Sequence, residues 1–297
     1  MNRTVLAVTA FLLLQPQPQS LSSQGAVRHP VQAEIYIMSV DGTDLRNLTN
    51  HPAQDEEPEF SPDGARILFD SDRNGNADIF VMNADGTALV QLTDSRAKED
   101  HGAWSRDGRF IAYQYDEGDN TDVYVMNADG SNKTRLTAHV ARDGWPDWSP
   151  DGRHIVFSSE RDGHREIYVM SRDGTGQRRL TSSDRHNTDP VWSPDGQWIA
   201  FNSERDGTSQ IYIMRPDGSK QTRVTQSSRF DQRPAWSPDS RRLAFGAGAS
   251  GQLTVMVIGL DDSEARPVSP PGTRQVRPDW SPDGRRLVVQ QNDSQSP

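Results

Sequence analysis

The sequence predicts an all-β protein, a six-bladed β-propeller, and three observations lead to that prediction. An aromatic residue followed by a Ser-Pro-Asp-Gly-type turn recurs at intervals of 44 residues, with its aromatic residue at Phe60, Trp104, Trp148, Trp192, Trp236 and Trp280. A second apolar motif keeps the same interval and begins at Ile35, Ile79, Val123, Ile167, Ile211 and Val255. No segment shows the 3.6-residue apolar period of an amphipathic helix. Self-similarity at this length is typical of repeat proteins, in which each unit buries its faces against the next.

Each repeat has the composition of four short antiparallel strands joined by tight turns. In the repeat that begins at Trp148, Pro150 fixes φ at the first corner of a turn and Gly152 accepts a positive φ. Apolar residues follow at 155–157 and 167–170, separated by further Asp-Gly turns. The apolar positions are consecutive rather than alternating, which predicts sheets buried on both faces. Blades packed face to face around an axis satisfy that requirement.

The two ends of the repeat array predict how the ring closes. The array begins with the second half of a repeat at residues 35–49 and ends with the first half at residues 280–290. The two halves make one composite blade of four strands, which closes the ring and removes exposed sheet edges. We therefore expect the propeller at residues 34–290, a short segment before it at residues 26–33, and a disordered tail at residues 291–297.

Residues 1–25 have the layout of a secretory signal peptide. Arg3 precedes an apolar run from Val5 to Leu14, which a Gln-, Pro- and Ser-rich stretch follows. The run is too short to span a bilayer, and a disordered or membrane-tethered terminus is the alternative. The chain has no cysteine, which excludes disulfides, thiol catalysis and a lipid anchor on cysteine. We expect a periplasmic or secreted protein that does not insert into the membrane.

The composition limits the classes of partner. The formal net charge is −10 and the isoelectric point is near 5.2, so a general electrostatic affinity for nucleic acid is not expected. Hydrophobic residues make up 33% of the chain and its mean hydropathy is −0.80. Short buried strands joined by many polar turns account for those values without invoking disorder. We expect a monomer.

The repeat resembles that of the TolB-family propeller, which carries Pro-x-Trp-Ser-Pro-Asp-Gly, Ile-Ala-Phe, Arg-x-Gly, Ile-Tyr, Asp-Gly and Leu-Thr in this order. The resemblance covers residues 34–290 and implies a six-bladed propeller of the cell envelope, with an envelope protein or a peptidoglycan-associated partner. The α/β domain that precedes the propeller in TolB has no counterpart here, so a role in a Tol–Pal system is not implied. Oligogalacturonate lyases carry a similar repeat, and a shared fold does not establish a shared function.

The connectors that lead into the innermost strands are the candidate binding surface, because the repeat varies there while packing positions stay uniform. Three residues before each recurring aromatic stand Glu57, His101, Trp145, Asp189, Arg233 and Arg277. Asp55 and Asp143 add carboxylates to the same connectors. The alternative is that Glu56 and Glu57 only pair with Arg274 and Arg277 across the ring closure. Such exposed pairs contribute about 0–1 kcal/mol each.

Two metal hypotheses arise from the connectors and turns. Asp70, Asp72 and Asn74, with Asp78 within reach, match the opening of a calcium loop. The position where such a loop places its bidentate Glu is Val81, inside an expected strand, so a plain hairpin turn explains the same residues. Four connector histidines offer imidazole ligands, but they occupy different positions in the repeat: His51, His101, His139 and His186. No other cofactor is expected.

The function that the sequence favours is a non-enzymatic binding scaffold of the cell envelope, which binds its partner through the channel rim. No catalytic residue is assigned, and the Gly-x-Ser-x-Gly turn of a serine peptidase is missing from the sequence. The alternative is a carbohydrate-active enzyme, a lyase or hydrolase, with its site in the central channel. Acidic, imidazole and guanidinium groups in the connectors motivate that alternative.

Overall fold

The computed structural model describes Met1, residues 32–249 and residues 252–292. Within these ranges every regular element is a β-strand, so this part of the chain contains no helix that could cross a membrane. The predicted signal peptide, the segment up to residue 31 and the tail from residue 293 lie outside the described residues, apart from Met1.

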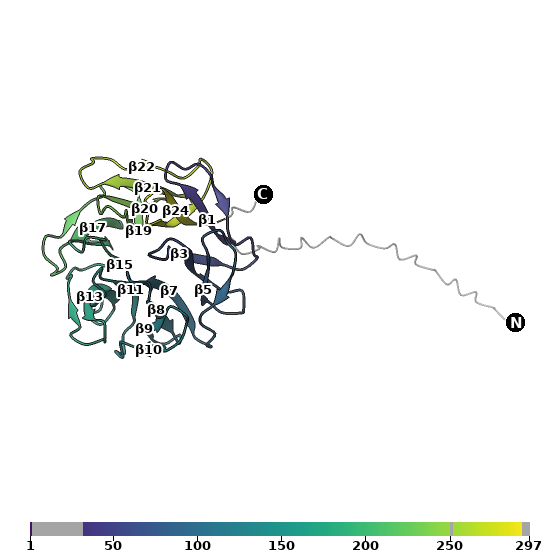
Figure 1. Cartoon of the computed structure of the whole chain (residues 1–297), viewed down its shortest axis with the longest axis horizontal. Helices are drawn as coiled ribbons and strands as arrows, with labels where there is room; N and C mark the ends of the chain where they lie inside the picture. Colours follow the sequence, from purple (N-terminus) through teal and green to yellow (C-terminus); the bar gives the residue numbers. More distant parts are fainter. Residues whose placement is uncertain (2–31, 250–251, 293–297) are drawn as a thin grey trace. The chain divides into compact units, whose positions relative to one another are not determined.

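The strands form six four-stranded antiparallel sheets that surround a common axis, which confirms the predicted propeller (Figure 1). We number the sheets as blades in chain order and give their strands from the axis outwards. Blade 1 contains β3 (Asp55–Phe60), β4 (Arg66–Ser71), β5 (Asp78–Asn83) and β6 (Val90–Gln91). Blade 2 contains β7 (Lys98–Trp104), β8 (Phe110–Asp116), β9 (Thr121–Asn127) and β10 (Thr134–Arg135). Blade 3 contains β11 (Asp143–Trp148), β12 (His154–Ser159), β13 (Glu166–Ser171) and β14 (Arg178–Arg179). Blade 4 contains β15 (Asn187–Trp192), β16 (Ile199–Ser203), β17 (Gln210–Met214) and β18 (Thr222–Arg223). Blade 5 contains β19 (Phe230–Trp236), β20 (Arg242–Ala249), β21 (Gln252–Gly259) and β22 (Arg266–Pro267).

Blade 6 is the predicted composite blade. It contains β23 (Gln275–Trp280) and β24 (Arg286–Asn292) from the end of the chain, then β1 (Ala33–Ser39) and β2 (Arg46–Asn47) from its beginning. All seven residues of β1 pair with β24, from Ala33 opposite Asn292 to Ser39 opposite Arg286. The pairing extends the propeller one residue before the expected start and two residues beyond the expected end.

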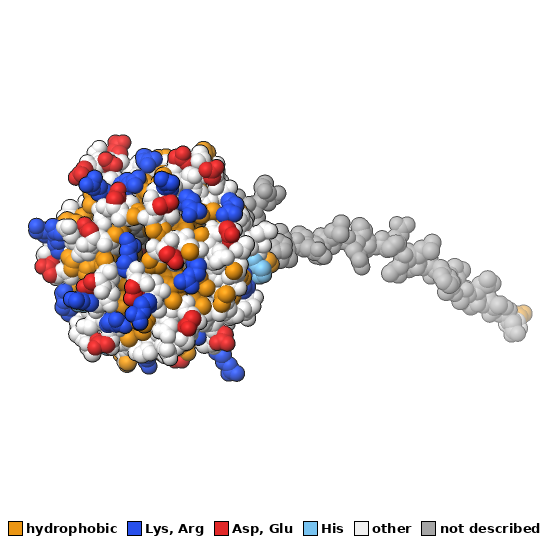
Figure 2. Space-filling view, viewed as in Figure 1, with side chains coloured by type: hydrophobic (Ala, Val, Ile, Leu, Met, Phe, Trp, Pro, Cys, Tyr) orange, Lys and Arg blue, Asp and Glu red, His pale blue; other side chains and the backbone are white. Residues whose placement is uncertain are grey.

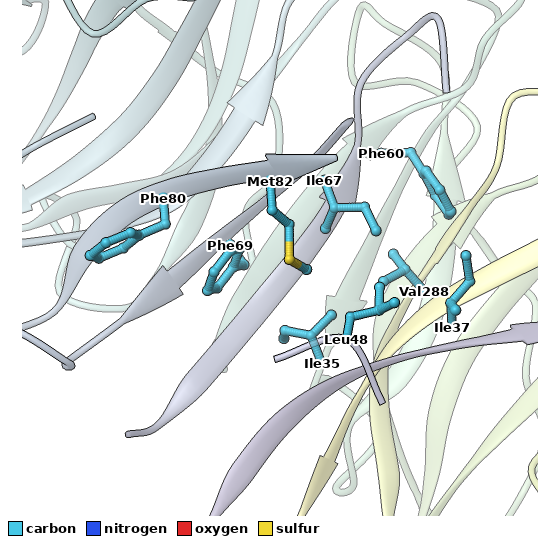
Figure 3. Close-up of a cluster of buried hydrophobic side chains, with 9 residues drawn as sticks. All are labelled: Ile35, Ile37, Leu48, Phe60, Ile67, Phe69, Phe80, Met82 and Val288. Carbon is cyan, nitrogen blue, oxygen red and sulfur yellow. The ribbon is translucent and has the colours of Figure 1, made fainter. Parts of the chain in front are cut away.

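The hydrophobic core is divided into six clusters, one between each pair of neighbouring blades. Figure 3 shows the cluster between blades 6 and 1, where Val288 of β24 faces Ile67 and Phe69 of β4. Leu68, between those two residues in sequence, belongs to the cluster between blades 1 and 2. Successive side chains therefore enter different clusters, which explains why the apolar positions are consecutive.

The outermost strands are only two residues long, shorter than the five or so expected from the sequence. A threonine or serine hydroxyl explains the early end of the ladder. In blade 1, Ile79 N donates to Thr93 Oγ1 at 2.8 Å, where a longer β6 would have offered a backbone carbonyl. The same contact recurs in blades 2 and 3 at Thr137 and Thr181. The Leu-Thr motif thus ends each blade at its outer edge.

Candidate functional site

Every innermost strand carries a bulge at the same position, and the bulge aims one side chain at the axis. The register shifts between Glu56 and Glu59 in blade 1 and at the equivalent place in the other blades. The bulged residue has a left-handed backbone with φ between 51° and 57° in each case: Glu57, His101, Trp145, Asp189, Arg233 and Arg277. Left-handed backbone is uncommon outside glycine, and bulges often redirect side chains at functional sites. These are the six rim residues that the sequence predicts, and all six line one axial cavity of about 250 Å³.

The charged rim residues form one ion network centred on Glu57. Its Oε1 lies 2.9 Å from His101 Nε2, 3.0 Å from Arg233 Nη1 and 2.7 Å from Arg277 Nη1. Arg233 Nη1 also lies 2.8 Å from Asp189 Oδ1. Blades 1 and 5 are not neighbours, so the contact between Glu57 and Arg233 crosses the channel. The network therefore closes the rim with side chains of five blades.

Trp145 supplies the sixth rim side chain. Its ring meets the His101 ring edge-on, with the ring centroids 5.4 Å apart. The guanidinium of Arg165 lies 4.5 Å from the Trp145 ring centroid, within range of a cation–π contact. An aromatic face is thus presented beside the ion network.

Charge compensation keeps the network ionised. Burial opposes ionisation of Glu57, but Arg233, Arg277 and His101 outweigh it and hold the pKa of Glu57 well below its usual value. Burial likewise opposes the charge on His101, yet Asp100 and Glu57 raise its pKa to about 10. Arg277 also contacts Glu56, at 3.3 Å. The pairing across the ring closure that the sequence offered as an alternative is therefore present, but it is one part of a network that spans the rim.

A second acidic layer lies deeper in the cavity, one residue before the recurring aromatic, at Glu59, Asp147 and Asp279. Each carboxylate accepts a backbone N–H from the next blade; Asp147 Oδ2, for example, lies 2.6 Å from Trp192 N. Burial, then the charge of Asp279, raises the pKa of Asp147 to about 7, while burial raises that of Asp279 to about 6. The sequence analysis missed this layer. Its signal was an acidic residue before the aromatic in three of the six repeats.

The far end of the cavity is apolar apart from one residue. The turn that follows each innermost strand contributes a proline in five blades: Pro62, Pro150, Pro194, Pro238 and Pro282. Blade 2 has Arg106 instead, where the recurring motif is Ser-Arg-Asp-Gly. The charged rim and the proline-lined end thus give the two mouths of the cavity different chemistry.

Asp55 and Asp143, predicted at the rim, do not line this cavity among the described residues. Both are fully buried inside their blades. Asp55 Oδ1 lies 2.9 Å from Arg73 Nη2, and Asp143 Oδ2 lies 2.8 Å from Arg161 Nη2. Each arginine comes from the hairpin after the second strand of the same blade, so these carboxylates hold a hairpin in place. The sequence could not separate them from rim residues because both kinds occupy the same connector.

The residues of the predicted calcium loop have separate partners. Asp70 Oδ2 accepts the backbone N–H of His101, and Asp72 Oδ1 accepts that of Gln54. Asn74 and Asp78 both contact Gln91. The other connector histidines also lie apart from His101: Nδ1 accepts a backbone N–H from Ala53 at His51, from Ala141 at His139 and from Arg165 at His186.

Fold and rim together define the class of this protein: a six-bladed β-propeller whose axial cavity opens through a ring of variable, charged side chains. Comparison with known families then identifies it more closely. The sequence model of the TolB beta propeller domain matches residues 16–119, 102–197 and 184–296. These matches cover most of the chain, which therefore belongs to the TolB β-propeller family, as the repeat indicated.

Individual relatives match over a shorter stretch. The Tol-Pal system protein TolB of Bordetella pertussis (strain Tohama I) is 48% identical over 44 residues, which are 14% of this chain and 10% of the relative. The TolB protein of Bordetella bronchiseptica matches with the same identity and coverage. The aligned stretch has the length of one repeat and spans about a tenth of these relatives.

Solved structures extend the similarity to the whole propeller. A structure assigned to TolB of Agrobacterium tumefaciens is 25% identical, with a TM-score of 0.78, over 89% of this chain and 99% of that chain. TolB of Acinetobacter baumannii is 17% identical, with a TM-score of 0.67, over 88% of this chain and 65% of that chain. Oligogalacturonate lyase of Vibrio parahaemolyticus shares the fold at 12% identity, with a TM-score of 0.56, over 88% of this chain and 98% of that chain.

Proposed function

We propose that this chain is an exported, non-enzymatic binding propeller of the cell envelope, which captures an envelope protein or a peptidoglycan-associated partner through its rim. The observation that carries the proposal is the convergence of the six bulged residues on one mouth of the axial cavity. The scaffold is uniform in all blades, whereas these six positions differ in charge, size and aromaticity. Variation confined to one surface of a repetitive scaffold is typical of a binding surface.

The chemistry of the rim indicates the kind of contact that a partner would make. Arg233 and Arg277 are paired but remain about one fifth exposed. A carboxylate of a partner segment could exchange with Glu57 for these guanidinium groups, while Trp145 packs against an apolar neighbour. Trp and Arg are the residue types that most often dominate binding energy at protein interfaces.

The envelope location and the class of partner rest on the relatives, two of which are named as Tol-Pal system proteins. The matches span about a tenth of those relatives, so the partner is proposed by class and not by name. The apolar run at residues 5–14 supports export and lies outside the described residues. A proteomic comparison of periplasm, membrane and medium would locate the protein, and recovery from the cytoplasm alone would contradict export.

Site-directed photo-crosslinking tests the rim. A photo-reactive amino acid at position 145 should give adducts with one envelope component, and Arg233→Ala with Arg277→Ala should abolish them. The matched control places the same amino acid at position 198. There Trp198 stacks with Arg215, whose guanidinium lies 4.0 Å from the ring centroid, and neither residue lines the cavity. Equal adducts from positions 145 and 198, or adducts that survive the arginine substitutions, would contradict the proposal.

The competing function is a polysaccharide lyase or hydrolase that acts in the axial cavity. The likeness to oligogalacturonate lyase is a likeness of fold at low identity. Incubation of the purified protein with acidic and neutral polysaccharides, with and without divalent metals, decides between the two functions. Release of new reducing ends that requires Asp147 or Asp279 would replace the binding proposal with an enzymatic one.

A further inference from the structure

The junction between blades 1 and 2 carries a cluster that the rim network does not explain. Asp70 from β4 and Asp100 and His101 from β7 each offer one ligand atom, and these atoms lie within 4.8 Å of one another. Asp70 is 4% exposed and Asp100 is 2% exposed. Two carboxylates are therefore held close together, away from water, where like charges repel strongly.

Hydrogen bonding leaves this cluster incomplete. Asp70 Oδ2 accepts the backbone N–H of His101 at 2.8 Å, but its buried Oδ1 has no hydrogen-bond partner among the described residues. Asp100 Oδ2 contacts Lys98 Nζ at 2.6 Å, which leaves Oδ1 facing His101 Nδ1 at 3.1 Å. Asp100 Oδ1 also lacks a hydrogen bond within the described chain. Buried polar atoms are nearly always satisfied in native proteins, so these atoms call for a partner.

The other five blade junctions show that the fold does not require this combination. The residues equivalent to Asp70, Asp100 and His101 are Gln114, Gly144 and Trp145; Ser158, Thr188 and Asp189; Asn202, Gln232 and Arg233; Gly246, Val276 and Arg277; and Gln290, Glu56 and Glu57. Where the first residue is Asn202, its neutral amide oxygen accepts the N–H of Arg233 at 3.1 Å. An amide therefore performs the structural task, and a carboxylate at position 70 adds a charge that packing does not need.

We propose that Asp70, Asp100 and His101 form a binding site for a divalent first-row transition ion, with Zn²⁺ as the best match. Two carboxylate oxygens and one imidazole nitrogen are ligands that Zn²⁺ accepts in proteins, whereas Ca²⁺ favours oxygen ligands alone. The site differs from the calcium loop considered for residues 70–78, because it joins two blades and uses neither Asp72 nor Asn74. The proposal does not depend on the binding role of the rim.

The geometry also supplies an outer contact for the metal ligand. His101 Nδ1 faces Asp100, while Nε2 lies 2.9 Å from Glu57 Oε1. An imidazole that binds a metal through one nitrogen usually donates its other N–H to a carboxylate, which fixes the ring and strengthens binding. Glu57 would serve as that positioning residue. Glu57→Gln should therefore weaken ion binding about 10- to 100-fold without removing a ligand.

Isothermal titration of the chelator-treated protein with Zn²⁺, Mn²⁺ and Ca²⁺ in turn tests the site. We expect one Zn²⁺ or Mn²⁺ per chain and a rise in melting temperature when the ion is present. Asp70→Asn and Asp100→Asn should remove both effects. Asp70→Asn should keep the fold, because the asparagine oxygen can accept the His101 N–H as Asn202 does for Arg233. The matched control is Asp72→Asn, an exposed carboxylate two residues away, which should bind the ion as the unaltered protein does.

Three results would overturn the assignment. The first is no binding of Zn²⁺ or Mn²⁺ at millimolar concentration. The second is binding that survives both Asp70→Asn and Asp100→Asn. The third is binding that Asp72→Asn removes and Asp100→Asn does not, which would place the ion in the turn after β4.

Discussion

A single carboxylate oxygen, Oε1 of Glu57, contacts cations from blades 2, 5 and 6. The carboxylate is only 13% exposed, so water replaces few of its contacts. Removing a partner from a buried ion pair costs more than the pair itself contributes, because the remaining charge stays buried. At the scale of the residue, this oxygen joins three blades that the chain does not connect directly.

Glu57→Gln should therefore lower the free energy of unfolding by about 3 kcal/mol, the range seen when a buried pair loses one partner. Urea denaturation at neutral pH measures the change. The control is Glu160→Gln, which removes a half-exposed partner of Arg165 and should cost at most about 1 kcal/mol. Similar losses for the two variants would show that Glu57 is not the centre of the network.

The deeper acidic layer predicts a dependence on pH. The pKa of Asp147 is raised from 3.8 to about 7 in the folded protein, first by burial and then by Asp279. A raised carboxyl pKa contributes stability below the unfolded value, near pH 3.8, and that contribution is lost as the pH rises towards 7. The ionised carboxylate is thus the less favourable form in the native state.

Asp147→Asn should accordingly gain stability relative to the unaltered protein between pH 5 and pH 8. One pKa unit corresponds to about 1.4 kcal/mol, and contact of the side chain with channel water reduces the full effect to about 1–2 kcal/mol. Urea denaturation at the two pH values gives the difference. Asp129→Asn, in an exposed turn, serves as the control and should follow the unaltered protein. A pH dependence equal to that of the unaltered protein would refute the altered titration of Asp147.

At the scale of the element, the outer Asp-Gly turns use glycine for two reasons. Gly130, between β9 and β10, has φ +83°, which side chains disfavour. A Cβ at this position would also lie 2.7 Å from the carbonyl oxygen of Leu92 in the preceding blade. The same approach recurs at Gly86, Gly174 and Gly218, so these turns form part of the contact between neighbouring blades.

Gly130→Ala should destabilise the protein by about 2–4 kcal/mol, since strain of about 1–2 kcal/mol adds to overpacking against Leu92. Gly163→Ala isolates the backbone term, because Gly163 has φ +92° and open space around its Cβ position. That control should lose only about 1–2 kcal/mol. Thermal and urea unfolding measure both variants, and equal losses would mean that the close carbonyl yields without cost.

At the scale of the whole molecule, stability depends on closing the ring. β24 pairs with β1 on one side and β23 on the other, and their side chains enter the clusters on both faces of blade 6. Trp280, Leu287, Val288 and Val289 are each at most 4% exposed. Every side chain of this kind contributes about 1.5–3 kcal/mol when buried, which together approaches the 5–15 kcal/mol of a typical domain.

Deleting residues 280–297 should therefore leave a protein that aggregates or unfolds, because it exposes β1 as an edge and opens two core clusters. Removing residues 293–297 alone leaves β24 whole and should change the melting temperature little. Size-exclusion chromatography and calorimetry distinguish these outcomes. A soluble, cooperatively unfolding fragment without residues 280–297 would show that blade 6 is not needed for closure.

The sequence by itself determined the number of blades, the order of their strands, the composite sixth blade and the six rim positions. Each of these depends on local chemistry that repeats along the chain, such as the Ser61 hydroxyl and Asp63 carboxylate that close the turn before β4. A repeat of fixed length makes such local choices consistent, so the architecture can be predicted from one unit and its ends.

Only the tertiary structure decided which side chains meet. Glu57 and Arg233 contact each other across the channel from different blades, and Asp70 meets Asp100 and His101 across a blade junction. Asp55 shares a connector with Glu57 but turns into its own blade, where Arg73 pairs with it. The direction of a side chain depends on the bulge and on the packing of the next blade, and neither is encoded in the spacing of one repeat.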